Sequence, residues 1–207
     1  MTDQINGVAA GVPYLALPPK SDPASAPVVV LWHLMDPPST PAALAAALPL
    51  NDVDAWRVYF ELPMTGQRLP AGGPEEVMRL GMEDAVANLF DPITAQAAAE
   101  FPSALAAVRE QLGVRSDQFA LVGGSMGSLV AALTAAETAA HATGDLRALV
   151  MLSPVSQLRP TVEANAALYG VEYAWNPAAE KVAARLDFVN RAAEIGVPLQ
   201  IVMGADD

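Results

Sequence analysis

Five short apolar runs, separated by longer stretches of helix-forming residues, constrain the fold of this chain more than any other feature of its sequence. Runs of this kind, bounded by turn residues, are typical of strands that are buried on both faces of a sheet. The stretches between them are rich in Ala, Leu, Glu and Arg, which favour helices. The expected strands are residues 28–32, 56–60, 118–122, 146–152 and 199–203, with a further edge strand at 12–17.

The intervening stretches are predicted to be helices. They cover residues 41–48, 74–90, 94–112, 128–142 and 177–195. Asp91 before Pro92 and Phe101 before Pro102 should interrupt this helical pattern, because the residue before a proline disfavours helical backbone. Strands that alternate with helices of ten or more residues form parallel βαβ units with right-handed crossovers. The predicted fold class is therefore α/β, a mainly parallel open sheet with helices on both faces.

Length and charge limit the domain organisation and the partners. The chain has 207 residues, 53% of them hydrophobic, which fits a single domain over residues 1–207. Eleven basic and twenty-three acidic residues give a net charge of −12, so the overall field repels phosphates and anionic lipid headgroups. Nucleic acid and membrane are therefore not expected as partners, and the oligomeric state stays open.

Composition also indicates a compartment and excludes some chemistry. No apolar run reaches the ~18 residues that span a bilayer, and no signal peptide is visible, so a cytoplasmic protein is expected. The many Ala, Arg, Asp and Pro residues are typical of a high-GC bacterial genome. The chain has no cysteine, which excludes disulfides, thiolate nucleophiles and cysteine-based zinc sites. We expect no metal and no cofactor.

The sharpest local signal is Gly-Gly-Ser-Met-Gly at residues 123–127, directly after the third apolar run and directly before a helical stretch. A G-x-S-x-G turn in this setting raises the serine hydroxyl above the sheet, and its glycines avoid collisions that a Cβ would cause. The backbone N–H of Met126 then points at the oxygen that becomes negative during acyl transfer. The alternative is a glycine-rich turn whose serine only caps the helix. The strand-to-helix placement favours Ser125 as a nucleophile.

At this motif the sequence resembles the α/β-hydrolase family, and more loosely its dienelactone-hydrolase-like and prolyl-oligopeptidase-like branches. The resemblance covers roughly residues 28–207. It implies that His33, at the end of the first apolar run, organises a loop and is not the catalytic base. It also implies that the backbone N–H of Leu34 is the second donor of the oxyanion hole. Leu34 departs from the glycine usual at this position, and a leucine restricts the close backbone approach that glycine permits.

The resemblance also implies a catalytic acid after the fifth apolar run. Gly204-Ala205-Asp206-Asp207 matches the loop that carries the triad acid, and the usual position, third after the glycine, selects Asp207. Asp206 is the alternative. The acid would hold a histidine in one tautomer while that histidine takes the serine proton.

No histidine follows Asp207, although the family order places the triad base there. His141 lies sixteen residues beyond Ser125 on the same helical stretch, which at 1.5 Å per residue is ~24 Å away and too far to act. The 207 residues alone are therefore expected to be inactive. The sequence is expected to be C-terminally incomplete, with the final strand and helix of the fold missing.

Residues 153–176, between the fourth and fifth runs, are longer than a crossover needs and are predicted to hold a small cap or lid. Tyr169, Tyr173 and Trp175 lie in this segment and, with Met35, would line a mostly apolar substrate pocket. A small hydrophobic cluster under a long loop is the alternative. For an anionic substrate, the candidate cations are Arg68, Arg79 and Arg159.

The predicted function is a carboxylic-ester hydrolase that acts on a small-molecule ester or acyl substrate through an acyl-serine intermediate. In this prediction Ser125 attacks, the N–H groups of Met126 and Leu34 hold the oxyanion, and Asp207 orients a histidine. Thioester, lactone and peptide hydrolysis would use the same machinery. Two alternatives remain: a non-catalytic binding or regulatory protein on the same fold, and a hydrolase whose histidine comes from another chain.

Overall fold

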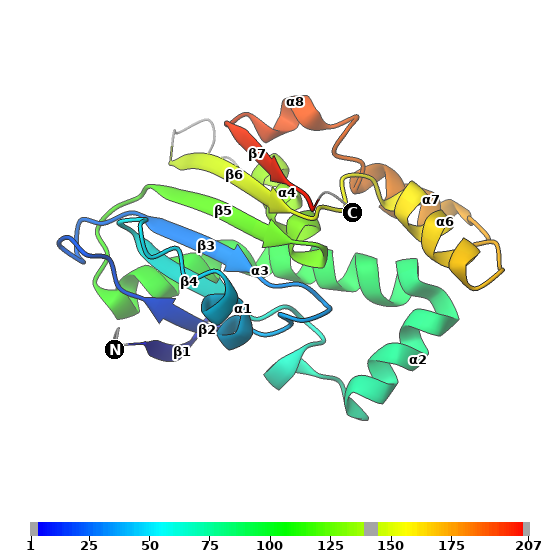
Figure 1. Cartoon of the computed structure of the whole chain (residues 1–207), viewed down its shortest axis with the longest axis horizontal. Helices are drawn as coiled ribbons and strands as arrows, with labels where there is room; N and C mark the ends of the chain where they lie inside the picture. The colour runs from blue at the N-terminus through cyan, green and yellow to red at the C-terminus, as the bar shows by residue number, and fades with distance from the viewer. Residues whose placement is uncertain (1–3, 139–144, 205–207) are drawn as a thin grey trace.

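A seven-stranded sheet with helices on both faces organises the computed structural model, which describes residues 4–138 and 145–204 (Figure 1). The strands are β1 (Ile5–Ala9), β2 (Val12–Leu17), β3 (Val28–Trp32), β4 (Trp56–Phe60), β5 (Phe119–Gly124), β6 (Leu146–Leu152) and β7 (Leu199–Val202). Their order in the sheet is β1-β2-β4-β3-β5-β6-β7. The strands from β4 to β7 in that order are parallel, and β1 and β2 are antiparallel. The mainly parallel α/β sheet predicted from the sequence is confirmed.

The antiparallel edge contains one strand that the sequence did not predict. β1 and β2 form a hairpin whose two turn residues, Ala10 and Gly11, have φ values of 48° and 88°. Two-residue hairpin turns favour positive φ because their twist then matches that of the strands. β1 gives no apolar run, since it reads Ile-Asn-Gly-Val-Ala and is mostly exposed, whereas every residue of β2 is buried.

The helices follow the expected stretches with several differences. They are α1 (Pro41–Ala47), the 3₁₀ turn η1 (Gly66–Arg68), α2 (Gly73–Ala85), the π-helical turn η2 (Val86–Phe90), α3 (Asp91–Leu112), α4 (Met126–Glu137), α6 (Leu158–Leu168), α7 (Pro177–Arg185) and α8 (Ala192–Ile195). The stretch predicted at 177–195 is two helices, and α6 lies inside the segment predicted to be a cap.

The predicted interruption at Pro102 is wrong. α3 continues through Pro102, and Phe101 before it is buried in the core, so tertiary packing outweighs the local preference. The real break is at Asp84, whose φ of −161° and ψ of 98° are extended rather than helical. The Asp84 carboxylate accepts a hydrogen bond from the N–H of Ala87 at 3.0 Å and so caps the next turn. Pro92 is tolerated because it lies in the first turn of α3.

Apolar side chains cover both faces of the sheet. On one face, α3 and α4 pack on residues of β3, β4 and β5 in the larger core cluster, which includes Trp32, Phe60 and Leu121. On the other face, α1 packs on Leu31 and Tyr59 in a smaller cluster. Because parallel strands are buried on both faces, their carboxyl ends provide a common edge where loops gather. Figure 1 shows α2 and the pair α6 and α7 extending beyond this edge.

Candidate active site

Ser125 lies where β5 passes into α4, in the strand-to-helix setting that the sequence predicts. Its backbone has φ 47° and ψ −114°, a conformation that residues other than glycine rarely adopt. Such a residue persists only where its surroundings hold it in place, and such residues cluster at active sites. The flanking Gly124 and Met126 are buried, whereas Ser125 is partly exposed. Ser125 is therefore the most accessible of these three residues.

The glycines on either side of Ser125 are required by close backbone packing. A Cβ on Gly123 would lie 2.0 Å from the carbonyl oxygen of Gly127, and a Cβ on Gly127 would lie 2.4 Å from the carbonyl oxygen of Trp32. Both obstacles are backbone atoms, which cannot move aside as a flexible side chain does. The turn therefore needs glycine at both positions, as the nucleophile interpretation requires.

Hydrogen bonds hold the backbone of Ser125 on both sides. Its N–H donates to the carbonyl of Leu152, at the end of β6, at 3.0 Å. Its carbonyl accepts from the N–H of Ser128 at 2.8 Å and from the Ser128 hydroxyl at 2.5 Å. Our sequence interpretation did not include Ser128. The signal was present, because serine side chains in a first helical turn commonly bond a carbonyl three residues earlier.

Leu34 fits above the turn because Gly124 leaves space for it. A Cβ on Gly124 would lie 2.5 Å from Cδ1 of Leu34, so the leucine side chain packs directly on the glycine backbone. The glycine that the resemblance places at position 34 is thus replaced by a leucine, and the close approach is made by Gly124. The loop after β3 consequently lies against the turn that carries Ser125.

His33 is fully buried and both of its ring nitrogens are hydrogen-bonded. Nε2 accepts from the N–H of Leu62 at 3.2 Å, so Nδ1 carries the proton and donates to the carbonyl of Leu34 at 2.6 Å. Burial lowers the pKa of His33 below its ordinary value, which favours this neutral form, while the bond to Leu34 opposes that shift. His33 therefore organises the loop that contains Leu34 and has no free nitrogen to act as a base.

Comparison with known proteins identifies the fold. No protein-family model and no curated protein matches the chain. Among solved structures, TT1662 from Thermus thermophilus is 15% identical at a TM-score of 0.57, over 99% of this chain and 90% of that one. The acylaminoacyl peptidase of Pyrococcus horikoshii is 13% identical at a TM-score of 0.60, over 100% of this chain and 32% of that one. The chain has the α/β-hydrolase fold.

A third similar α/β-hydrolase structure is 2,6-dihydroxy-pseudo-oxynicotine hydrolase, which is 18% identical at a TM-score of 0.55. The alignment covers 97% of this chain and 52% of that one. Because these identities are low, the likeness shows that the backbone arrangement is shared and leaves the substrate to the residues of the site.

The predicted catalytic acid and the second histidine lie outside the described residues. These are Asp206 and Asp207, after β7, and His141, after α4. β7 is parallel to β6, which is parallel to β5, so the carboxyl end of β7 lies along the same sheet edge as Ser125. The N–H of Ser153, just after β6, donates to the carbonyl of Val202 at 2.7 Å and ties the two strand ends together.

The four residues predicted to line a substrate pocket fall into two groups. Met35, Tyr173 and Trp175 are partly buried and pack against the larger core cluster. The Tyr173 and Trp175 rings pack edge to face with centroids 4.7 Å apart, and the Tyr173 hydroxyl donates to Asp84 at 2.6 Å. Tyr169 caps the C-terminal end of α6 and is 85% exposed to solvent, unlike the other three.

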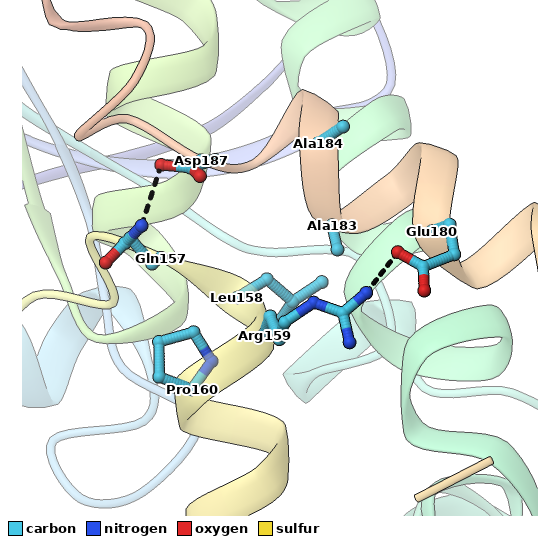
Figure 2. A pocket seen from close by; sticks show the side chains of 8 residues that line it. All are labelled: Gln157, Leu158, Arg159, Pro160, Glu180, Ala183, Ala184 and Asp187. Atoms are coloured by element: carbon cyan, nitrogen blue, oxygen red, sulfur yellow. Dashed lines mark hydrogen bonds and ion pairs between the residues drawn. The ribbon is translucent and has the colours of Figure 1, made fainter. Parts of the chain in front are cut away.

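A hollow of about 240 Å³ lies between α6 and α7 (Figure 2). Its lining is Gln157, Leu158, Arg159, Pro160, Glu180, Ala183, Ala184 and Asp187. Of the residues that the sequence analysis singles out, the lining includes Arg159, a candidate cation, and none of those predicted for the nucleophile, the oxyanion hole or the apolar pocket. Figure 2 shows its polar side chains bonded to one another, with Gln157 donating to Asp187 at 3.1 Å and Arg159 paired with Glu180. The residues that line the hollow are therefore different from Ser125 and its flanking glycines.

The candidate cations for an anionic substrate are already paired. Arg68 donates both to the carbonyl of Glu61 and to the carboxylate of Glu100, the latter at 2.7 Å. Arg79 pairs with two carboxylates of its own helix, and Arg159 with those of Glu163 and Glu180. Within residues 4–138 and 145–204, no group of three or more His, Asp or Glu side chains is arranged to hold a metal. No helix of that same part is long and apolar enough to cross a membrane.

Proposed function

We propose that this chain is a serine hydrolase that cleaves a neutral carboxylic ester, or a related acyl bond, through an acyl-serine intermediate. The observation that carries the proposal is the strained, partly exposed Ser125 at the head of α4, enclosed by glycines that no other residue can replace. Structures of the same fold named a hydrolase and a peptidase support hydrolytic chemistry. A net charge of −12 and the pairing of its arginines favour a neutral substrate.

In the proposed reaction the Ser125 hydroxyl oxygen attacks the acyl carbon while a base removes the hydroxyl proton. The bond between the acyl carbon and the alcohol oxygen then breaks, and the alcohol leaves with that proton. Water then attacks the acyl-serine while the base takes one of its protons; the bond between the acyl carbon and the serine oxygen breaks, the carboxylic acid departs, and the base gives the water-derived proton to Ser125. The N–H of Met126, the first amide of α4, has no acceptor within its helix and is the proposed donor to the oxyanion.

The second oxyanion donor is proposed to come from the loop at Leu34 and Met35. The bond from His33 fixes the Leu34 carbonyl, and the Met35 N–H at the other end of that peptide points the opposite way. The Leu34 N–H, expected from the resemblance, and the Met35 N–H are therefore the two candidates. Met35, Tyr173 and Trp175 supply apolar surface from the proposed cap segment at 153–176 and the loop beside it.

The base must come from outside the described residues, because His33 is buried with both nitrogens bonded. We propose a histidine that is oriented by Asp207, with Asp206 as the alternative acid.

The test is hydrolysis of p-nitrophenyl acetate and butyrate by the full gene product and its Ser125→Ala variant. Ser103→Ala, at an exposed position of α3, is the matched control. We expect Ser125→Ala to lose turnover by at least about a thousandfold and Ser103→Ala to retain it. A serine-directed fluorophosphonate should label the wild type and the control and leave Ser125→Ala unlabelled. Equal turnover in Ser125→Ala and the wild type would overturn the proposal.

A non-catalytic binding protein on the same fold is the second candidate, and the bonded state of His33 is what favours it. It predicts no turnover and no fluorophosphonate labelling in the full gene product, together with saturable binding of an ester. Saturable binding without turnover would therefore select this function over the first.

A further inference from the structure

Ser128 is a fully buried serine in the first turn of α4, and its hydroxyl links the Ser125 turn, this helix and the segment at Val155. The hydroxyl donates to the carbonyl of Ser125 at 2.5 Å. It accepts a hydrogen bond from the N–H of Val155 at 3.1 Å. Val155 is itself buried and lies between β6 and α6, in the segment proposed as the cap.

The bond from Val155 determines where the single proton of this hydroxyl points. A serine hydroxyl has one proton to donate and lone pairs to accept. Because the Val155 N–H occupies a lone pair, the proton is directed at the Ser125 carbonyl, which is its one acceptor among the described residues. A short O–H···O contact of this length is at the strong end of the range for neutral groups.

The carbonyl that Ser128 holds belongs to the same peptide group as the Met126 N–H. A trans peptide is planar, with its C=O and N–H pointing in opposite directions. The two donors from Ser128, its N–H at 2.8 Å and its hydroxyl at 2.5 Å, thus also fix the direction of the Met126 N–H. A hydrogen bond to the carbonyl additionally polarises the peptide, which makes its N–H a stronger donor.

We propose that Ser128 is a positioning residue for the oxyanion donor and couples that donor to the cap segment at Val155. Its hydroxyl holds the Ser125–Met126 peptide at the angle that turns the Met126 N–H toward the oxyanion. A movement of the cap at Val155 changes the orientation of the Met126 N–H through this hydroxyl. The proposal rests on the proposed serine hydrolase function, and Ser128 itself touches no reacting atom.

The test compares Ser128→Ala with Thr134→Val in the full gene product. Thr134 is a matched control because it is buried in the same helix and its hydroxyl has no partner among the described residues. For Ser128→Ala we expect kcat to fall about tenfold with KM nearly unchanged, since the donor is weakened and not removed. Thr134→Val should keep the wild-type kcat.

A second kinetic readout separates positioning from general structural damage. Sulfur accepts hydrogen bonds poorly, so an effective oxyanion donor makes an enzyme prefer an oxygen ester over the matching thionoester. Ser128→Ala should show a smaller preference for p-nitrophenyl acetate over its thionoacetate, and Thr134→Val the wild-type preference. A uniform loss with an unchanged preference in Ser128→Ala would overturn the proposal.

An NMR measurement tests the geometry independently of turnover. The chain has eight methionines, so ¹⁵N-methionine labelling gives a spectrum simple enough to assign Met126. In Ser128→Ala the Met126 amide proton should move upfield, and in a second sample labelled with ¹⁵N-valine the Val155 amide should exchange faster. Both signals should be unchanged in Thr134→Val. An unmoved Met126 resonance in a folded Ser128→Ala protein contradicts the proposal. If the wild type lacks Ser125-dependent turnover while the resonance still moves, the hydrolase function fails and the coupling stands.

Discussion

β5 and β7 are both short apolar runs in the sequence, yet they occupy opposite settings in the sheet. β5 lies between β3 and β6, is covered by helices, and ends in the Ser125 turn. Among the described residues β7 pairs with β6 alone, and its Leu199, Ile201 and Val202 are 42%, 45% and 48% exposed. An apolar run therefore predicts a strand, whereas the elements packed around the strand determine whether a strained residue can persist at its end.

The covered setting is what allows a strained residue at the end of β5. A backbone conformation like that of Ser125 costs of order 1–3 kcal/mol and persists only if neighbouring contacts hold it. Hydrogen bonds from Ser128 and to Leu152 supply that support, together with the packing of Leu34 on Gly124. β7 has a strand neighbour on one side only among the described residues, so it offers no comparable support.

The largest change in the free energy of unfolding should come from adding a Cβ at the close backbone contact at the end of β5. Gly123→Ala places a Cβ 2.0 Å from a backbone oxygen, so we expect a loss of more than about 4 kcal/mol in the free energy of unfolding. Urea denaturation followed by circular dichroism measures it. Gly170→Ala is the control, because no atom lies within 4 Å of the added Cβ and its cost is limited to the strain of its own φ of 68°. Equal midpoints for the two variants would contradict the packing described for the turn.

Side-chain truncation compares the two strands directly. Leu121→Ala in β5 removes a fully buried side chain and should lower the free energy of unfolding by about 2–5 kcal/mol. Ile201→Ala in β7 removes a side chain that is 45% exposed and should lower it by less than about 1.5 kcal/mol. Both are measured by urea denaturation under the same conditions. Similar losses would mean that β7 is covered in solution.

Local patterns predicted the fold and the setting of Ser125 well, and contacts distant in sequence explain where they failed. The apolar runs became strands because their period and length already suit a covered sheet, and the residues at 123–127 became a strand-to-helix turn because that choice is local. The accommodation of Leu34 by Gly124 joins residues ninety positions apart, and the bond of His33 to Leu62 joins β3 to the turn after β4. Neither pairing is visible in a local pattern.

The same limit applies to the helices and the pocket. α3 runs through Pro102 because Phe101 is anchored in the core, and that anchor depends on the sheet beneath it. Tyr169 was grouped with Tyr173 and Trp175 because aromatic residues favour pockets, but Tyr169 is 85% exposed whereas the rings of Tyr173 and Trp175 pack on each other. Exposure at a helix end is a property of the folded molecule and of its neighbours.

The pH dependence of stability tests whether His33, in the loop beside the β5 turn, is buried in solution. Burial lowers the pKa of His33 below 6.5, so the unfolded chain binds this proton more readily than the folded one. The contribution of His33 to stability is therefore complete above about pH 6.5 and is lost as the pH falls, by at most ~1.4 kcal/mol per pH unit. Urea midpoints between pH 5 and 8 for the wild type and His33→Asn measure it.

The difference between the two His33 curves is the informative quantity, because other groups titrate as well. Burial raises the pKa of Glu61, which makes its own contribution weaken as the pH rises, opposite in sign to that of His33. Subtracting the His33→Asn curve removes this common background. If the difference in stability between the wild type and His33→Asn stays constant from pH 5 to 8, the pKa of His33 is the same in the folded and unfolded chain, which contradicts its burial.

A charge placed in β7 should have the smallest effect on stability. It tests whether β7 is exposed, in contrast to β5. Ile201→Lys keeps the long alkyl stem against the sheet and places its ammonium group in solvent, so the free energy of unfolding should change by less than about 0.5 kcal/mol. An exposed apolar edge strand also promotes association, and a lysine there opposes it. Sedimentation velocity at high concentration should show less self-association for Ile201→Lys than for the wild type. A large loss of stability would instead place Ile201 in a covered position and make β7 resemble β5.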